Sequence, residues 1–135
     1  MKKLIVMVGL PKSGKSTWAI STGYPVVSRD ALGHALNKLM STDAFHERFK
    51  TRLIKHLQIM ILALFNAGHE TMVLDYTNLT IQERGFWRSP DWNVEYKIIP
   101  TSLDACLSRT NDEETIKKIK IDFELCDVPE IKREE

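Results

Sequence analysis

The chain has 135 residues, of which 43% are hydrophobic and 27% charged, and its formal net charge is +1. These values are typical of a globular protein, and the length predicts one domain, residues 1–135, with a sizeable core. The two cysteines and four histidines show no metal-ligand spacing, which argues against a disulfide scaffold or a metal cluster. Beyond the N-terminal run, the longest apolar stretch spans residues 59–65, too short for a bilayer. We therefore expect a cytoplasmic protein with reduced cysteines and no membrane partner.

Charge is unevenly distributed along the chain. Residues 1–111 carry 14 Lys and Arg against 9 Asp and Glu, a net of +5, whereas residues 112–135 carry 5 against 9, a net of −4. A positive body suits an anionic substrate, but random surface charge explains the pattern equally well. A basic stripe typical of nucleic-acid binding is missing from the sequence.

The first predicted element is a strand over Lys3–Val8, and it leads directly into the octet Gly9-Leu10-Pro11-Lys12-Ser13-Gly14-Lys15-Ser16. This octet fits G-x-x-x-x-G-K-[ST], in which a strand delivers a loop of backbone N–H groups to a phosphate and a helix N-terminus completes it. We expect Lys15 to reach the β- and γ-phosphates of ATP and the Ser16 hydroxyl to ligate Mg²⁺. The predicted ATP-binding residues are Gly9, Lys12, Ser13, Gly14, Lys15, Ser16 and Thr17.

Helices and strands are expected to alternate along the rest of the chain. Further strands are predicted at residues 25–28, 71–75 and 94–99. Helices are predicted after Lys15 and over residues 30 to about 40, about 43–67, 81–88, 103–110 and about 113–125. The tail after Cys126 is expected to be poorly ordered.

Several helix ends carry recognisable signals. Thr42 is a plausible N-cap of the long helix at 43–67, and Gly68 is its C-terminal stop. Its buried face is expected to consist of Leu53, Leu57, Met60 or Ile61, and Leu64. The shorter helices have predicted caps at Thr80, with Glu83 completing a capping box, and at Ser102.

This alternation predicts a single α/β domain with a parallel sheet of about four strands flanked by helices. Functional groups gather at the carboxyl ends of the strands in such sheets. Three motifs fall at that edge: Ser28-Arg29-Asp30, the segment Asp75-Tyr76-Thr77-Asn78, and Arg109. The predicted acceptor-binding residues are Arg29, Asp75, Asn78 and Arg84.

Each of these motifs has a second interpretation. Asp30 is the best candidate for a general base acting on an acceptor hydroxyl, but it is also a plausible N-cap of the helix that follows. Asp75 ends a strand that resembles a Walker-B strand and is a candidate Mg²⁺ ligand, or it forms a turn. Asn78 either caps the next segment or holds the loop in shape. Arg109 is a candidate catalytic cation that contacts the phosphates in the transition state, or it is a neutral surface arginine.

Taken together, Gly9 to Trp18, Ser28-Arg29-Asp30, and residues 73–80 with Glu83-Arg84 resemble the 5′-kinase domain of phage-type polynucleotide kinases, in the P-loop kinase superfamily. The motifs follow the order of that family over roughly residues 1–110. The resemblance implies a P-loop kinase fold with a short helical lid near the C-terminus. It also implies a set of roles: Lys15 on the donor phosphates, Ser16 on the metal, Asp30 as base for a 5′-hydroxyl, Asp75 supporting acceptor and metal, and Arg109 beginning the lid.

The chain departs from that family at two places. Gly33, followed by His34, stands where the family has an arginine that helps to bind the acceptor phosphate. The acidic run at residues 110–114 replaces a second lid arginine. Three hypotheses therefore stay open: a polynucleotide 5′-hydroxyl kinase, a P-loop kinase for a nucleoside, nucleotide or sugar, and a nucleotide-binding regulator with weak or no catalysis.

Overall fold

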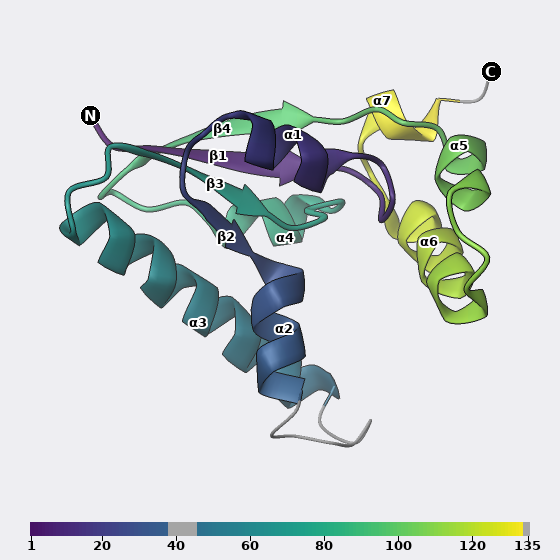
Figure 1. Ribbon diagram of the computed structural model, residues 1–135, viewed down its shortest axis with the longest axis horizontal. Helices are drawn as coiled ribbons and strands as arrows, with labels where there is room; N and C mark the ends of the chain where they lie inside the picture. Colours follow the sequence, from purple (N-terminus) through teal and green to yellow (C-terminus); the bar gives the residue numbers. More distant parts are fainter. Residues whose placement is uncertain (38–45, 134–135) are drawn as a thin grey trace.

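In the computed structural model, which describes residues 1–37 and 46–133, four strands form one parallel sheet in the order β2-β3-β1-β4 (Figure 1). The bounds are β1 Lys3–Val8, β2 Val26–Ser28, β3 Thr71–Asp75 and β4 Asn93–Ile98. Strand β2 begins one residue later than predicted, and β4 begins and ends one residue earlier than predicted, while β1 and β3 match their predicted bounds. Runs that are apolar on both faces, as in β1 and β3, occupy the two central positions, where helices cover both sides.

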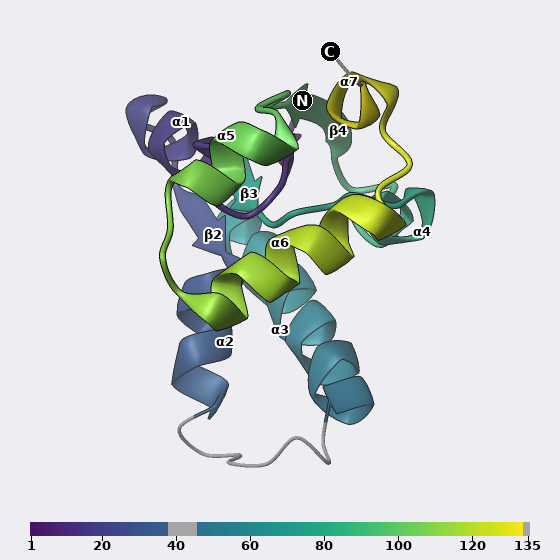
Figure 2. The same cartoon turned by 90° about the vertical axis from the view of Figure 1, so that its right-hand side faces the viewer.

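Helices flank the sheet and gather at the carboxyl ends of its strands (Figures 1 and 2). In chain order the helices are α1 Lys15–Ser21, α2 Arg29–Asn37, α3 His46–Asn66, α4 Ile81–Gly85, α5 Leu103–Ser108, α6 Glu113–Leu125 and α7 Pro129–Lys132. Helix α1 packs on one face through Ala19, which joins a cluster with Ile5 and Met7 of β1. Helix α3 covers the opposite face, and α5 and α6 stand at the strand ends, where the lid was predicted.

The main core lies between α3 and the sheet. The helix buries Leu53, Leu57, Ile61 and Phe65 against strand residues that include Leu4, Val6, Met72 and Leu74. The predicted face is confirmed with Ile61 in place of the exposed Met60, and with Phe65 buried more deeply than Leu64. Each fully buried side chain of this size contributes about 1.5–3 kcal/mol, so this face anchors the helix to the sheet.

Two helices end earlier than their patterns predict. Helix α4 stops at Gly85 and not at Arg88, because the chain turns and buries Trp87, whose Nε1 donates to Asn78 Oδ1 at 2.6 Å. Helix α5 stops at Ser108. The predicted caps Thr80 and Ser102 are confirmed, since their hydroxyls accept from the amides of Glu83 and Ala105. Thr42 and the predicted boundary near Met40 lie outside the described residues.

The expectation of a poorly ordered tail was wrong for residues 127–133. Val128 and Ile131 are buried in a second core with Val8, Leu10 and Leu79, and α7 forms on this anchor. The Asp127 amide also donates to the carbonyl of Leu79 at 2.9 Å. Hydrophobic burial therefore orders a segment whose charge pattern alone indicated a frayed end.

Both cysteines, Cys106 and Cys126, are buried and are not joined by a disulfide. Over the part of the chain that the structure describes, every helix is too short or too polar to cross a bilayer.

Candidate functional site

The loop between β1 and α1 has the backbone that a phosphate cradle requires. Gly14 has φ of +99° and Lys12 has φ of +67°, so the chain turns back on itself within the loop, and the Ser13 amide donates to the Leu10 carbonyl at 3.1 Å. A Cβ on Gly9 would lie 2.7 Å from Ser13 Oγ, which explains the glycine at this position. Thr101 fixes the far side of the loop by donating to the Ser13 carbonyl at 2.7 Å.

Lys15 lies at the centre of the site and is nearly buried, with 8% of the residue exposed. Burial lowers the pKa of its ammonium group, because removal from water disfavours the charged form. The carboxylates of Asp75, Asp30 and Asp122 offset part of this effect. Carboxylates from β3, α2 and α6 thus act electrostatically on this one lysine.

Ser16 and Asp75 meet directly, although 59 residues separate them in the sequence. The Ser16 hydroxyl donates to Asp75 Oδ2 at 2.6 Å, which joins the first turn of α1 to the end of β3. A hydroxyl and a carboxylate are oxygen ligands of the kind that Mg²⁺ takes. Thr17, the next residue, is exposed on the same turn.

At the end of β2, the interpretation of Asp30 as a helix cap was wrong. Ser28 is the capping side chain, since its hydroxyl accepts from the Ala31 amide at 3.2 Å. Asp30 lies in the first turn of α2, and its carboxylate is 84% exposed, with Arg29 Nη1 as an ion-pair partner at 3.2 Å. The Asp30 carboxylate is thus available to a ligand, and Arg29 is held beside it.

Asn78 and Arg84 form the inner framework of the loop after β3. Asn78 is fully buried with φ of +48°, and its amide donates to the Met7 carbonyl at 2.8 Å. Arg84 donates to the Asn78 carbonyl at 3.2 Å and to Asp127 Oδ1 at 2.6 Å. A buried Asn78 cannot touch an acceptor, so it holds the loop in shape, and Arg84 is already engaged within the protein.

Arg109 lies beside the phosphate loop. It is the C-cap residue of α5, and its Nη1 donates to the Lys12 carbonyl at 2.9 Å. In the segment 110–114 that follows, Asp112 is the N-cap of α6, and its carboxylate accepts a hydrogen bond from the Thr115 amide at 3.1 Å. Arg109 is thus the cation that α5 brings to the loop.

Two residues near the site, Asp122 and Tyr76, were given no role of their own from the sequence. Asp122 is on the inner face of α6, one turn after the buried Ile119, and its Oδ2 is buried without a hydrogen bond. Lys118 Nζ lies 3.2 Å from that oxygen, close enough for an ion pair but outside hydrogen-bond geometry. Burial raises the pKa of Tyr76, the residue after Asp75, to about 12. The spacing of Asp122 from Ile119 was the available signal, but only tertiary packing brings α6 to the strand ends.

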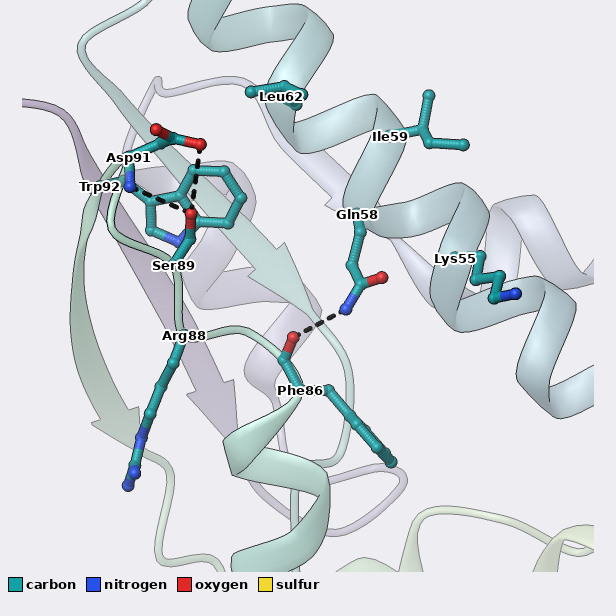
Figure 3. A pocket seen from close by; sticks show the side chains of 9 residues that line it. All are labelled: Lys55, Gln58, Ile59, Leu62, Phe86, Arg88, Ser89, Asp91 and Trp92. Carbon is teal, nitrogen blue, oxygen red and sulfur yellow. Dashed lines mark hydrogen bonds between the residues drawn. The ribbon is translucent and has the colours of Figure 1, made fainter.

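One well-defined pocket lies away from this site (Figure 3). It has a volume of about 380 Å³ between α3 and the segment after α4, where Gln58 Nε2 donates to the Phe86 carbonyl at 2.8 Å. In Figure 3 the side chains of Lys55 and Arg88 extend away from its centre. The residues of the phosphate loop take no part in it.

Comparisons with known proteins agree with the geometry. A family model described as an AAA domain matches residues 4–128. Among solved structures, the chain is similar to one of the Pnkp1/Rnl/Hen1 complex, with a TM-score of 0.62 and 22% identity over 83% of this chain and 40% of that one. It is also similar to a putative kinase from Chloroflexus aurantiacus, with a TM-score of 0.62 and 19% identity over 80% of this chain and 64% of that one. Thus the chain spans less than two thirds of each of these two proteins.

A third solved structure, the APS kinase CysC of Mycobacterium tuberculosis in complex with AMPPNP and APS, has a TM-score of 0.59 and 20% identity. The match covers 86% of this chain and 72% of that one. At these identities the likenesses establish the fold, and the predicted P-loop kinase fold is confirmed.

Proposed function

The chain belongs to the AAA domain family, and on this premise we propose that it transfers the γ-phosphate of ATP to a hydroxyl group, with the 5′-hydroxyl of a polynucleotide end as the leading acceptor. The observation that carries the proposal is the 2.6 Å hydrogen bond from the Ser16 hydroxyl to the Asp75 carboxylate, next in sequence to the buried Lys15. It joins a donor-phosphate loop to a strand-end carboxylate at the edge where parallel α/β sheets bind ligands.

On the donor side, the loop at residues 9–16 supplies backbone amides to the phosphates, and Lys15 supplies a fixed positive charge. Because Lys15 is already desolvated, its attraction to phosphate oxygens meets little competition from water. Arg109 stands at the rim of the same loop, where a cation stabilises the charge that develops on the transferred phosphoryl group.

The Ser16 hydroxyl and the Asp75 carboxylate fit Mg²⁺, since both are oxygen ligands and they already lie within hydrogen-bond distance of each other. When bound, the ion neutralises charge on the phosphates.

On the acceptor side, Asp30 is the proposed general base. Its exposed carboxylate is paired with Arg29 and is not used as a cap, so an incoming hydroxyl can reach it and transfer a proton to it. The sequence motifs shared with phage-type polynucleotide kinases support a 5′-hydroxyl as that acceptor.

A small hydroxylated molecule is the second candidate, and two observations favour it. Arg84 is bound to Asp127 and to the Asn78 carbonyl, which leaves it less available for an acceptor phosphate. The carboxylate of Asp122, which is paired with Lys118, also acts electrostatically on Lys15 and Tyr76. An acidic acceptor side suits a neutral or cationic hydroxylated acceptor better than a nucleic-acid end.

The test is a panel of radiolabelled phosphoryl transfers from MgATP to 5′-hydroxyl DNA, 5′-hydroxyl RNA, nucleosides and sugars. We expect transfer to a 5′-hydroxyl end, and a loss of about 10²–10⁴ in rate for Asp30→Asn with ATP affinity unchanged. Asp104→Asn, an exposed carboxylate on α5, is the matched control and should transfer at the wild-type rate.

Nucleotide binding is measured separately, by thermal unfolding with and without MgATP. Ligand at about 100 times its Kd stabilises the folded state by roughly 2.7 kcal/mol. Stabilisation without transfer to any acceptor would contradict the kinase proposal and support the regulator. The absence of stabilisation would remove any nucleotide role.

A further inference from the structure

Strand β4 is an edge strand with an open hydrogen-bonding side. It pairs with β1, and within the described residues no strand lies on its other side. The amides of Asn93 and Ile99 donate to the carbonyls of Lys2 and Val8, so the odd-numbered residues of β4 direct their backbone groups toward β1. By alternation, the N–H and C=O groups of Val94, Tyr96 and Ile98 point to the open edge.

The side chains on this edge carry opposite charges on one face of the sheet. Lys97 Nζ lies 5.2 Å from the ring centre of Trp18 in α1, and Glu95 forms an ion pair with Lys3 at 3.4 Å. Both are therefore on the face that α1 covers. Tyr96 lies on the other face, where its hydroxyl donates to the Arg84 carbonyl at 3.3 Å.

We propose that the open edge of β4 binds β4 of a second copy of this chain, antiparallel, about a two-fold axis that passes between the two Tyr96 residues. Closed two-fold pairs are the commonest assemblies of identical chains, and each copy presents the same edge. The two Tyr96 residues then exchange both backbone hydrogen bonds, and Val94 pairs with the partner's Ile98. The two sheets become one continuous sheet.

Charge selects this register. With the axis at Tyr96, Glu95 lies directly opposite the partner's Lys97, and the symmetric pair repeats the contact. A shift of the axis by one residue places Glu95 against the partner's Glu95, or Lys97 against the partner's Lys97, which repels. Both charged pairs occupy the non-hydrogen-bonded positions, where opposing side chains approach most closely.

The other face of the edge is complementary as well. A pocket of about 220 Å³ adjoins the carboxyl half of β4 and is lined by residues that include Tyr96, Ile98 and Val128. In the proposed register the partner's Val94 lies opposite Ile98 on this face. An apolar side chain thus meets the apolar wall of the pocket, while the charged pairs lie on the α1 face.

The experiment is sedimentation equilibrium of the purified chain from low micromolar to near-millimolar concentration, with four proteins: wild type, Glu95→Lys, Lys97→Glu and the double variant. Each single variant turns two attractive cross-strand pairs into repulsive ones and should raise the dimer Kd about tenfold or more. The double variant restores both pairs and should recover a Kd close to that of the wild type.

A mixture of the two single variants gives the sharpest outcome. The Glu95→Lys chain then has lysine at both positions and the Lys97→Glu chain has glutamate at both, so the mixture should form a heterodimer although neither chain pairs with itself. Thermal unfolding of each variant checks that the monomer is folded. A wild type that stays monomeric at all concentrations overturns the proposal. So does a dimer that is insensitive to the single changes, or one that the double variant fails to restore.

Discussion

At the residue scale, Lys15 shows a conflict between ligand binding and stability, because the buried position that suits a phosphate lowers the free energy of unfolding when no ligand is bound. An ammonium group held at 8% exposure loses most of its hydration, and burial accordingly lowers its pKa. We predict that Lys15→Met raises the free energy of unfolding without ligand by about 1 kcal/mol, because an apolar chain of similar length fills the space without a charge. MgATP should no longer stabilise this variant. Urea unfolding with and without MgATP measures both effects.

The pH dependence of this stability effect follows from the direction of the pKa shift of Lys15, which is downward. Below the lowered pKa, Lys15 is protonated in both the folded and the unfolded chain, and the full cost of burying the charge is present. As the pH rises through the folded pKa toward 10.5, the folded state releases its proton and the cost shrinks. The stability advantage of Lys15→Met should therefore narrow at alkaline pH. Lys12→Met, an exposed lysine of the same loop, serves as the control and should leave ligand-free stability unchanged.

Asn78 shows how one buried amide fixes several segments. It bonds the carbonyl of Met7 and the Nε1 of Trp87 while it holds a φ of +48°. We predict that Asn78→Ala lowers the free energy of unfolding by about 3 kcal/mol, because the buried indole N–H loses its partner and alanine is strained at positive φ. Asn78→Gly loses the same bonds but relieves the strain, so it should be more stable than the alanine variant by up to about 1 kcal/mol. Equal stabilities of the two variants in urea would contradict the strain argument.

At the element scale, the starts of α4 and α5 were more predictable than their ends. Thr80 and Ser102 were found from the sequence because a cap bonds an amide only three residues away. The end of α4 at Gly85 was missed because it depends on Trp87 turning inward to Asn78, a tertiary contact. Helix α7 was also missed because it depends on tertiary contacts: Val128 and Ile131 pack in a core that includes Val8 of β1.

The same distinction runs through the candidate site. The phosphate loop could be identified from the sequence because its eight residues are contiguous. Its glycines are required by the local conformation of the loop and not by distant contacts. The pairing of Arg84 with Asp127 joins positions 43 residues apart and removes Arg84 from the freely available cations. Asp122 was missed for the same reason, since its place near Lys15 depends on how α6 docks.

Asp127 connects the C-terminal segment to α4, and its contribution should depend on pH. Its carboxylate accepts from the Ile81 amide and from Arg84 Nη2, each at 2.6 Å. Partial burial raises its pKa, but the Arg84 and Ile81 hydrogen bonds and the charge of Arg84 outweigh this, and the pKa lies below 3.8. We predict that Asp127→Asn lowers the free energy of unfolding at neutral pH by about 1 kcal/mol, a modest value because the group is partly exposed and screened.

The sign of the pH effect follows from the lowered folded pKa. The stabilisation is fully present above the unfolded value near 3.8 and is lost as the pH falls through the folded pKa. Wild type and Asp127→Asn should therefore converge in acid. Thermal unfolding from neutral pH to below pH 3 measures the difference, with Glu130→Gln on α7 as an exposed control. If the difference in stability between wild type and Asp127→Asn persists unchanged in acid, the contribution of Asp127 comes from packing and not from its charge.

At the scale of the whole molecule, the charge distribution limits how a nucleic-acid end could bind. The body is positive by sequence, yet Arg84 is paired with Asp127, Arg29 is beside Asp30, and Asp122 of α6 acts electrostatically on Lys15. An acceptor with phosphates would therefore meet a small number of cations at the strand ends and not an extended basic groove. Affinity for an oligonucleotide should come mainly from its terminal nucleotides.

The number of phosphates that the protein contacts can be measured from the salt dependence of oligonucleotide binding. Each phosphate neutralised on a single strand contributes about −0.7 to the slope of log K against log salt concentration. We predict a slope no steeper than about −2 for a 5′-hydroxyl oligonucleotide, measured by fluorescence anisotropy over a salt series. Arg29→Ala should make the slope shallower by about 0.7, whereas Arg84→Ala should leave it unchanged because that guanidinium is held by Asp127. A much steeper slope would mean that other cations of the body line a nucleic-acid path, which would favour a polynucleotide acceptor over a small molecule.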